Sequence, residues 1–122
     1  MAELQLGEME AKFAELIWTN APIATVELVK RCERTLSWKR TTTYTVLKRL
    51  CEKGLFETAN GTVSVVISRE EFFARQSRQY VDTAFRGSLP AFLAAFTGGR
   101  RLTAAEAAEL RALIAQAEED AP

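Results

Sequence analysis

The residues best suited to bind another molecule lie between positions 37 and 54, where the chain reads SWKRTTTYTVLKRLCEKG. If this segment is a helix of about 3.6 residues per turn, one side is apolar, with the spacing of a core-facing stripe. That side carries Thr43, Val46, Leu47, Leu50 and Cys51. The opposite side carries Thr41, Thr45, Lys48, Arg49 and Glu52, with Lys39 and Arg40 at its start. Short hydroxyl groups fit close to DNA base edges and long basic side chains reach phosphates, so the pattern is typical of a DNA recognition helix.

The candidate DNA contacts lie on this polar side or at its edges. They are Lys39, Arg40, Thr41, Thr42, Tyr44, Thr45, Lys48 and Arg49. Threonine is a poorer helix former than alanine, so a run of threonines on an exposed surface favours contact with a partner. Tyr44 lies at the border of the two sides, where it either stacks on the sugar-phosphate backbone or packs beside the segment that follows. Trp38 either covers the core, which we favour, or donates its indole N–H to a phosphate.

Charge is distributed unevenly along the chain. The formal net charge is zero, but residues 30–53 contain eight Lys or Arg against two Glu, a local charge of +6. Residues 1–20 and 103–122 carry local charges of −3 and −4. A basic block between acidic ends favours a patch that binds a polyanion, and the alternative is an ordinary solvated helix face.

Composition argues against several classes of function. The 122 residues suffice for one compact domain, or for a small domain with a helical extension. The chain has no His and no Gly-rich phosphate loop, so we expect neither an enzyme nor a cofactor. Cys32 and Cys51 fall at apolar-facing positions, which favours buried small side chains over a disulfide or a metal site, while a redox-sensing pair stays open. Without a run of about 18 apolar residues or a basic signal sequence, we expect a cytoplasmic protein with no membrane contact.

Local signals in residues 1–68 predict three helices and a hairpin. The helices are expected at 7–19, 25–34 and 39–53, with Thr25 as an N-cap and Gly54 at the end of the third. Strands at 55–58 and 62–68 flank Ala59-Asn60-Gly61, and Asn-Gly is a strong hairpin signal. This order is that of a winged helix-turn-helix, so the expected fold is mainly α with a small β-hairpin.

The apolar residues of the first two helices define the expected core. In the first helix the stripe is Met9, Phe13, Leu16 and Ile17, with Trp18 beside them in the core. In the second helix, Val26, Val29 and Cys32 are expected to face inward, with Leu28 nearby.

Residues 69–122 predict a helical tail, with helices at 69–85, 89–96 and 103–119 joined at Gly87-Ser88 and Gly98-Gly99. Five of the seven phenylalanines lie in this tail, which is too thin to bury them within itself. We therefore expect a homodimerisation domain; the alternative is a tail folded back on its own winged helix. The candidate dimer contacts are Phe72, Phe73, Tyr80, Phe85, Phe92, Phe96, Leu110 and Leu113.

Three segments resemble one family, the penicillinase-repressor family of bacterial winged-helix regulators, which includes repressors of β-lactamase and methicillin-resistance genes and copper-responsive repressors. Residues 6–18, LGEMEAKFAELIW, are similar to its opening helix, and residues 42–54, TTYTVLKRLCEKG, to its recognition helix. The tail matches at residues 85–88 and 102–111. The resemblance covers residues 6–117 and implies a homodimer that binds palindromic operators and represses transcription. In it, Thr42 and Thr45 match residues that approach the bases, and Lys48 and Arg49 match a basic pair.

The chain departs from the family pattern in several places. Thr41 stands where the family often has Lys, which implies a changed base preference. The hairpin tip, Asn60-Gly61-Thr62, lacks the usual basic residue, which implies a weaker grip on phosphate. Sensor-controlled members are cut at an Asn-Phe bond, and the corresponding pair here is Ala95-Phe96, so we do not expect induction by that route. The tail has no cysteine, which excludes copper sensing through the Cys-rich motif of that branch.

These observations predict a dimeric transcriptional repressor, with residues 1–68 binding double-stranded operator DNA and residues 69–122 forming the dimer. Helix 39–53 is expected in the major groove. The alternative is a winged-helix module that binds another protein and not DNA; the +6 block argues against it. Neither the regulated genes nor the inducing signal follows from the sequence.

Overall fold

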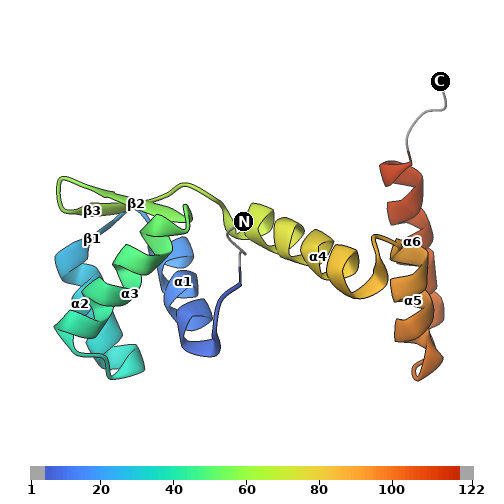
Figure 1. Ribbon diagram of the computed structural model, residues 1–122, viewed down its shortest axis with the longest axis horizontal. Coiled ribbons are helices and arrows are strands. Elements are labelled where there is room, and N and C mark those ends of the chain that lie inside the picture. Colours follow the sequence, from blue (N-terminus) through green and yellow to red (C-terminus); the bar gives the residue numbers. More distant parts are fainter. Residues whose placement is uncertain (1–4, 119–122) are drawn as a thin grey trace. The chain divides into compact units, whose positions relative to one another are not determined.

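The computed structural model describes residues 5–118. Its elements, in chain order, are α1 (Glu8–Asn20), β1 (Ile23–Ala24), α2 (Thr25–Leu36), α3 (Arg40–Glu52), β2 (Phe56–Ala59), β3 (Thr62–Val65), α4 (Arg69–Phe85), α5 (Leu89–Gly98) and α6 (Ala104–Ala117) (Figure 1). The chain forms two compact units, which divide within α4 between Gln79 and Tyr80. Three helices followed by a hairpin make the first unit a winged helix-turn-helix, as predicted, and a helical tail follows. The functional division into residues 1–68 and 69–122 stays a prediction.

The wing of the first unit is a small antiparallel sheet of strand order β1-β3-β2, which lies across one end of α1, α2 and α3 (Figure 1). Asn60 and Gly61 form the two-residue turn between β2 and β3, with φ angles of 52° and 73°. A type I′ turn needs positive φ at both positions, which is why Asn-Gly signals a hairpin. The strand β1 was not predicted; it pairs Ile23 with Val63.

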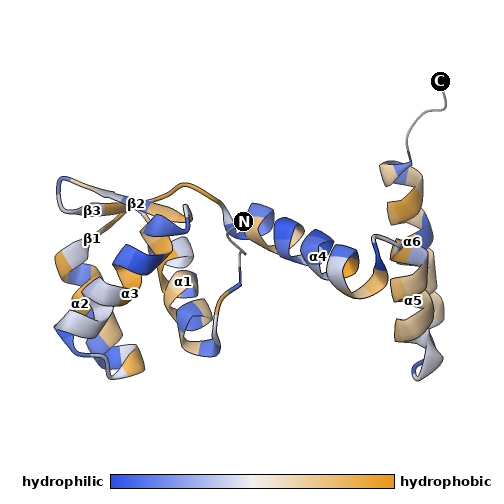
Figure 2. Ribbon diagram, viewed as in Figure 1, coloured by the Kyte–Doolittle hydropathy of each residue, from blue (hydrophilic) through white to orange (hydrophobic). Residues whose placement is uncertain are grey.

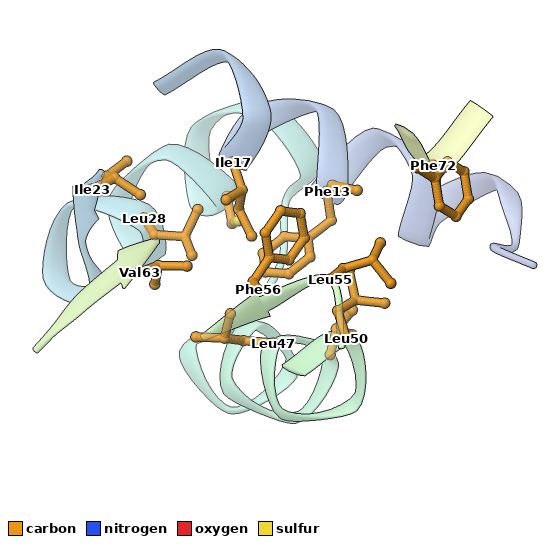
Figure 3. Packing of buried hydrophobic residues seen from close by; sticks show 13 residues of the cluster. Phe13, Ile17, Ile23, Leu28, Leu47, Leu50, Leu55, Phe56, Val63 and Phe72 are labelled. Carbon is orange, nitrogen blue, oxygen red and sulfur yellow. The ribbon is translucent and has the colours of Figure 1, made fainter. Parts of the chain in front are cut away.

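A single apolar core holds the first unit together. Figure 3 shows Phe13 and Ile17 of α1 directed toward Phe56 of β2, with side chains of α2 and α3 on either side. The buried cluster is Phe13, Ala14, Ile17, Ile23, Leu28, Cys32, Val46, Leu47, Leu50, Leu55, Phe56, Val63 and Phe72. Trp18 and Trp38 are half-buried and pack against this cluster, which confirms the core role favoured for each. The ring of Trp38 lies 5.2 Å from that of Phe13, between centroids.

Three residues expected in the core are exposed or only half-buried, and one predicted helix cap is wrong. Met9 is 42% exposed because the first turn of α1 extends past the core, and Val26 is 62% exposed because α2 turns Leu28, Val29 and Cys32 inward instead. Cys51 is only half-buried, beside the Thr58 hydroxyl of β2 at 3.7 Å. Thr25 is not an N-cap: Ala24 takes that position, and the Thr25 backbone N–H donates to the Gly61 carbonyl at 2.9 Å.

The helix α3 ends in a backbone motif at Gly54, the residue that the sequence placed at its end. Gly54 has a φ of +86°, in the left-handed region that glycine adopts without strain. Its N–H donates to the Cys51 carbonyl at 3.0 Å, and the Leu55 N–H donates to the Leu50 carbonyl at 3.1 Å. These two bonds form a Schellman motif, which satisfies carbonyls that the helix would otherwise leave unpaired.

The first turns of α4 are bound to α1 within the same unit. The Trp18 indole N–H donates to the Ile67 carbonyl at 3.0 Å, and the Arg69 guanidinium binds the Glu15 carboxylate. The Trp18 ring also packs on those of Phe72 and Phe73. The start of the predicted tail is therefore part of the winged-helix unit.

The second unit contains the end of α4 with α5 and α6, and none of the described residues 80–118 is buried. Ser88 caps α5 by accepting the Ala91 N–H at 3.1 Å. Thr103 and Glu106 form a reciprocal capping box at the start of α6, with both bonds at 3.0 Å. Figure 2 shows α5 hydrophobic along most of its length. Within residues 5–118, no helix combines the length and the apolar character needed to span a membrane.

Candidate nucleic-acid interface

The helix α3 is held by its apolar side, which leaves its polar side outward. Thr43, Val46, Leu47 and Leu50 are buried against the core. Thr43 also donates its hydroxyl to the Lys39 carbonyl at 3.4 Å, so this buried polar group is satisfied within the helix. All eight residues singled out as DNA contacts are exposed: Lys39, Arg40, Thr41, Thr42, Tyr44, Thr45, Lys48 and Arg49.

The polar side of α3 combines hydroxyl groups with lysines that have no ionic partner in the described part of the chain. The Thr45 hydroxyl donates to the Thr41 carbonyl at 2.9 Å, which orients the side chain and leaves its oxygen able to accept a further hydrogen bond. Among residues 5–118, no carboxylate lies within ion-pair distance of Lys39 or Lys48. A hydroxyl row flanked by unpaired lysines suits a surface that approaches base edges and phosphates together.

Tyr44 lies at the edge of α3 between α2 and the wing. It is 37% exposed and borders a hollow that it shares with Thr25, Lys48 and Thr58. On its other side, the Arg40 guanidinium lies over the ring, 5.6 Å from the centroid. The ring packs beside the wing and keeps an exposed edge. It can therefore still stack on a sugar-phosphate backbone, and both interpretations of Tyr44 stay open.

The opposite edge of α3 carries cations that are already paired. The Arg49 Nη1 lies 3.0 Å from Oε2 of Glu10 in α1, and the Lys53 Nζ lies 3.8 Å from Oε1 of the same carboxylate. The Gly7 backbone N–H also donates to Glu10, at 3.0 Å. The Gly7 N–H first, and the Arg49 guanidinium second, lower the pKa of Glu10 below its ordinary value. Glu10 is therefore ionised at neutral pH, and Arg49 differs from Lys48 in having a fixed partner.

The wing is anchored to the helices but brings no cation. Thr25 at the start of α2 donates its backbone N–H to the Gly61 carbonyl at the tip. Glu57 is the single charged residue in the sequence from Leu55 to Val65. That most phosphate contacts are made by α3 and its start stays a prediction.

The residues singled out for dimerisation fall into two groups. Phe72 is 2% exposed and lies in the core of the first unit, so we do not carry it forward as a dimer contact, and Phe73 packs beside it while staying 50% exposed. The others belong to the second unit, where the rings of Tyr80, Phe85 and Phe92 meet edge to face, within about 6 Å of one another.

A groove of about 460 Å³ runs between α5 and α6 in the second unit. Most of its lining is apolar: Phe92, Leu93, Phe96, Leu102, Leu110 and Leu113, with Glu106 and Glu109 at its edge. Phe96 is 45% exposed and Leu113 60% exposed. Apolar side chains left in water at this density indicate a surface that another molecule covers.

Sequence reasoning missed Glu10 as a partner of α3. Glu10 and Arg49 are 39 positions apart, so no local pattern joins them. The sequence did show an acidic charge on residues 1–20 and a basic charge on residues 30–53. These charges indicate attraction between the two segments but do not identify which residues pair.

Comparison with known proteins gives a family. The sequence profile described as penicillinase repressor matches residues 6–116. A penicillinase repressor of Bacillus licheniformis is 26% identical over 114 residues, which cover 90% of this chain and 89% of that protein. The matched stretch includes every element from α1 to α5 and nearly all of α6.

Proposed function

The chain belongs to the penicillinase repressor family of transcriptional repressors, and from this premise we propose that it acts as a homodimer that binds operator DNA. In this proposal each protomer inserts α3 into the major groove of one half-site. Thr41, Thr42 and Thr45 approach the bases, and Lys39 and Lys48 bind phosphates. A protein that acts on chromosomal DNA in a bacterial cell works in the cytoplasm.

The observation that carries the DNA-binding proposal is the uncovered polar side of α3. A helix that only stabilised the core would gain nothing from several exposed threonines and lysines on its outer side. An exposed helix of this width and polarity fits the major groove, which is about 12 Å wide. The +6 charge of residues 30–53 supplies sequence-independent attraction to the phosphates.

The homodimer is supported by the state of the second unit. With none of residues 80–118 buried, this unit has no core of its own, and isolated helices as short as α5 and α6 are marginal in water. In a dimer, the apolar residues of α5 and α6 in one protomer would cover the groove of the other protomer. Two-fold symmetry then matches that of a palindromic operator.

Fluorescence anisotropy with a labelled duplex from the promoter of the neighbouring gene tests DNA binding. Lys48→Ala should weaken binding and make the plot of log K against log salt shallower by about 0.9, the worth of one phosphate contact. Lys12→Ala is the matched control, because it removes the same charge from an exposed position on α1. If Lys48→Ala behaved like Lys12→Ala, the proposed docking of α3 would be wrong; if the wild type bound no DNA, a protein-binding winged helix would replace this proposal.

A further inference from the structure

Glu10 occupies an unusual position between α1 and the end of α3. Its side chain is 16% exposed, whereas the carboxylates of Glu8 and Glu15 on the same helix are 85% and 50% exposed. It receives the Gly7 N–H, the Arg49 guanidinium and the Lys53 ammonium. Lys53 is itself 25% exposed and donates to the Gln5 carbonyl at 2.9 Å. One carboxylate therefore engages both basic residues at the carboxy-terminal end of α3.

This arrangement divides the basic residues of α3 into two kinds. Lys48 projects without an ionic partner among the described residues, whereas Arg49, the next residue, has its charge compensated 3.0 Å away. A guanidinium that already binds a carboxylate must give up that bond before it can bind a phosphate. Its contribution to phosphate binding falls accordingly.

Engaging these cations affects the part of DNA binding that does not depend on sequence. Affinity for random DNA comes almost entirely from cations on phosphates, and every extra phosphate contact raises it without regard to sequence. Withholding two cations from the phosphates therefore lowers the sequence-independent part of binding, which is nearly all of the affinity for random DNA.

We propose that Glu10 is a positioning residue, which holds Arg49 and Lys53 away from DNA phosphates and so limits the sequence-independent part of DNA binding. The inference rests on the proposed function, since it assumes that α3 faces DNA. It assigns Glu10 no contact with DNA of its own; the carboxylate acts through the two cations that it binds.

Glutamine at position 10 tests the proposal, because it keeps the acceptor for the Gly7 N–H and removes the charge. Glu10→Gln should bind a random-sequence duplex more tightly than wild type, with a salt slope steeper by about 0.9 for each cation released. From the same slope, each released cation should raise affinity about eightfold near 0.1 M salt. Glu8→Gln is the matched control: it removes the same charge from the same helix, at a residue whose one ion pair is with Lys12.

Two further variants assign the effect to the named cation, and the second of them, Arg49→Ala alone, does not depend on the folding of Glu10→Gln. Glu10→Gln with Arg49→Ala should recover part of the wild-type slope. Arg49→Ala alone should change the slope much less than Lys48→Ala, because Arg49 is already engaged. An equal effect of Arg49→Ala and Lys48→Ala would overturn the proposal, as would identical slopes for Glu10→Gln and Glu8→Gln.

The outcomes also separate this inference from the proposed function. If the wild type binds DNA and Lys48→Ala makes the slope shallower, α3 faces DNA whatever Glu10 does. If in that case Glu10→Gln leaves random-DNA binding at the control level, only the role of Glu10 is refuted.

Discussion

The exposed side chains of α3 differ in what holds them, and this difference sets what each can do on DNA. The Thr45 hydroxyl is oriented by the Thr41 carbonyl, Lys48 is free among the described residues, and Arg49 is bound to Glu10. Free lysines act on any phosphate, whereas an oriented hydroxyl acts only where a base presents a partner. Affinity and selectivity should therefore respond to different substitutions.

Replacing Thr45 by valine should lower selectivity without unfolding the protein. Valine keeps the shape and the β-branch but lacks the hydroxyl, so operator affinity should fall roughly two- to tenfold, the worth of one hydrogen bond. Binding to random duplex should not change. Competition titrations with operator and random duplexes measure the ratio, and Thr35→Val, at an exposed position near the end of α2, is the control. A parallel loss on both duplexes would contradict a base-reading role for Thr45.

Glu10 should also make stability depend on pH on the acid side. Its pKa is lowered in the folded protein, by the Gly7 N–H and then by Arg49, so the folded state binds this proton more weakly than the unfolded state. The resulting stability is present above the ordinary value of 4.5 and is lost as pH falls through the folded pKa. Urea unfolding should therefore show that Glu10→Gln is less stable than wild type at neutral pH, and that the gap narrows below 4.5.

Arg49→Ala provides the comparison for this pH effect. It removes the second cause of the lowered pKa and leaves the first, so its loss of stability on acidification should lie between those of wild type and Glu10→Gln. A gap between wild type and Glu10→Gln that stayed constant with pH would contradict an ionised Glu10 at this contact.

At the scale of elements, the helices with strong local signals were the best predicted. The sequence indicated helices at 7–19, 39–53 and 69–85, and the structure has Glu8–Asn20, Arg40–Glu52 and Arg69–Phe85. The hairpin was predictable because Asn60 and Gly61 tolerate positive φ. In contrast, β1 has two residues and exists through its pairing with β3, which local reasoning does not detect.

The candidate site was predicted in part for the same physical reason. Helical periodicity correctly separated the buried side of α3 from the exposed side. Periodicity does not predict contacts between elements, such as the ion pair of Glu10 with Arg49 or the hydrogen bond from the Thr25 N–H to the Gly61 carbonyl. Helical periodicity does not show whether the exposed residues bind DNA, so DNA binding stays a prediction.

The end of α3 should be sensitive to the residue at position 54. Gly54→Ala forces a side chain into the left-handed region and should lower the free energy of unfolding by about 1–2 kcal/mol, although space around the position is open. Gly54→Asn should cost less, because asparagine tolerates this conformation better. Thermal and urea unfolding check the order Gly, Asn, Ala; equal stability of the three would contradict the Schellman ending.

At the scale of the whole molecule, the open apolar groove of the second unit predicts its oligomeric state. Leu113→Glu puts a charge into the groove between α5 and α6 and should convert a dimer to monomers. Because Leu113 is 60% exposed in the single chain, the substitution should leave the fold of the winged helix intact. Sedimentation velocity measures the change in mass.

Ala108→Glu is the matched control for this prediction. It adds the same charge to the same helix at an exposed residue that does not line the groove. A dimer that survives Leu113→Glu as well as Ala108→Glu would show that another surface joins the protomers, and a monomeric wild type would contradict dimerisation altogether.

The central claim is that a dimer reads operator DNA with the exposed side of α3, and the DNA that the protein selects tests it most directly. Genomic fragments retained by the purified wild-type protein at physiological ionic strength should be sequenced, with Lys48→Ala and Lys12→Ala treated alike. The account predicts fragments that share an inverted repeat, with half-site centres about 10 base pairs or a multiple apart, retained by Lys12→Ala and weakly by Lys48→Ala. Retained fragments with no common sequence, or equal retention by the two variants, would contradict it.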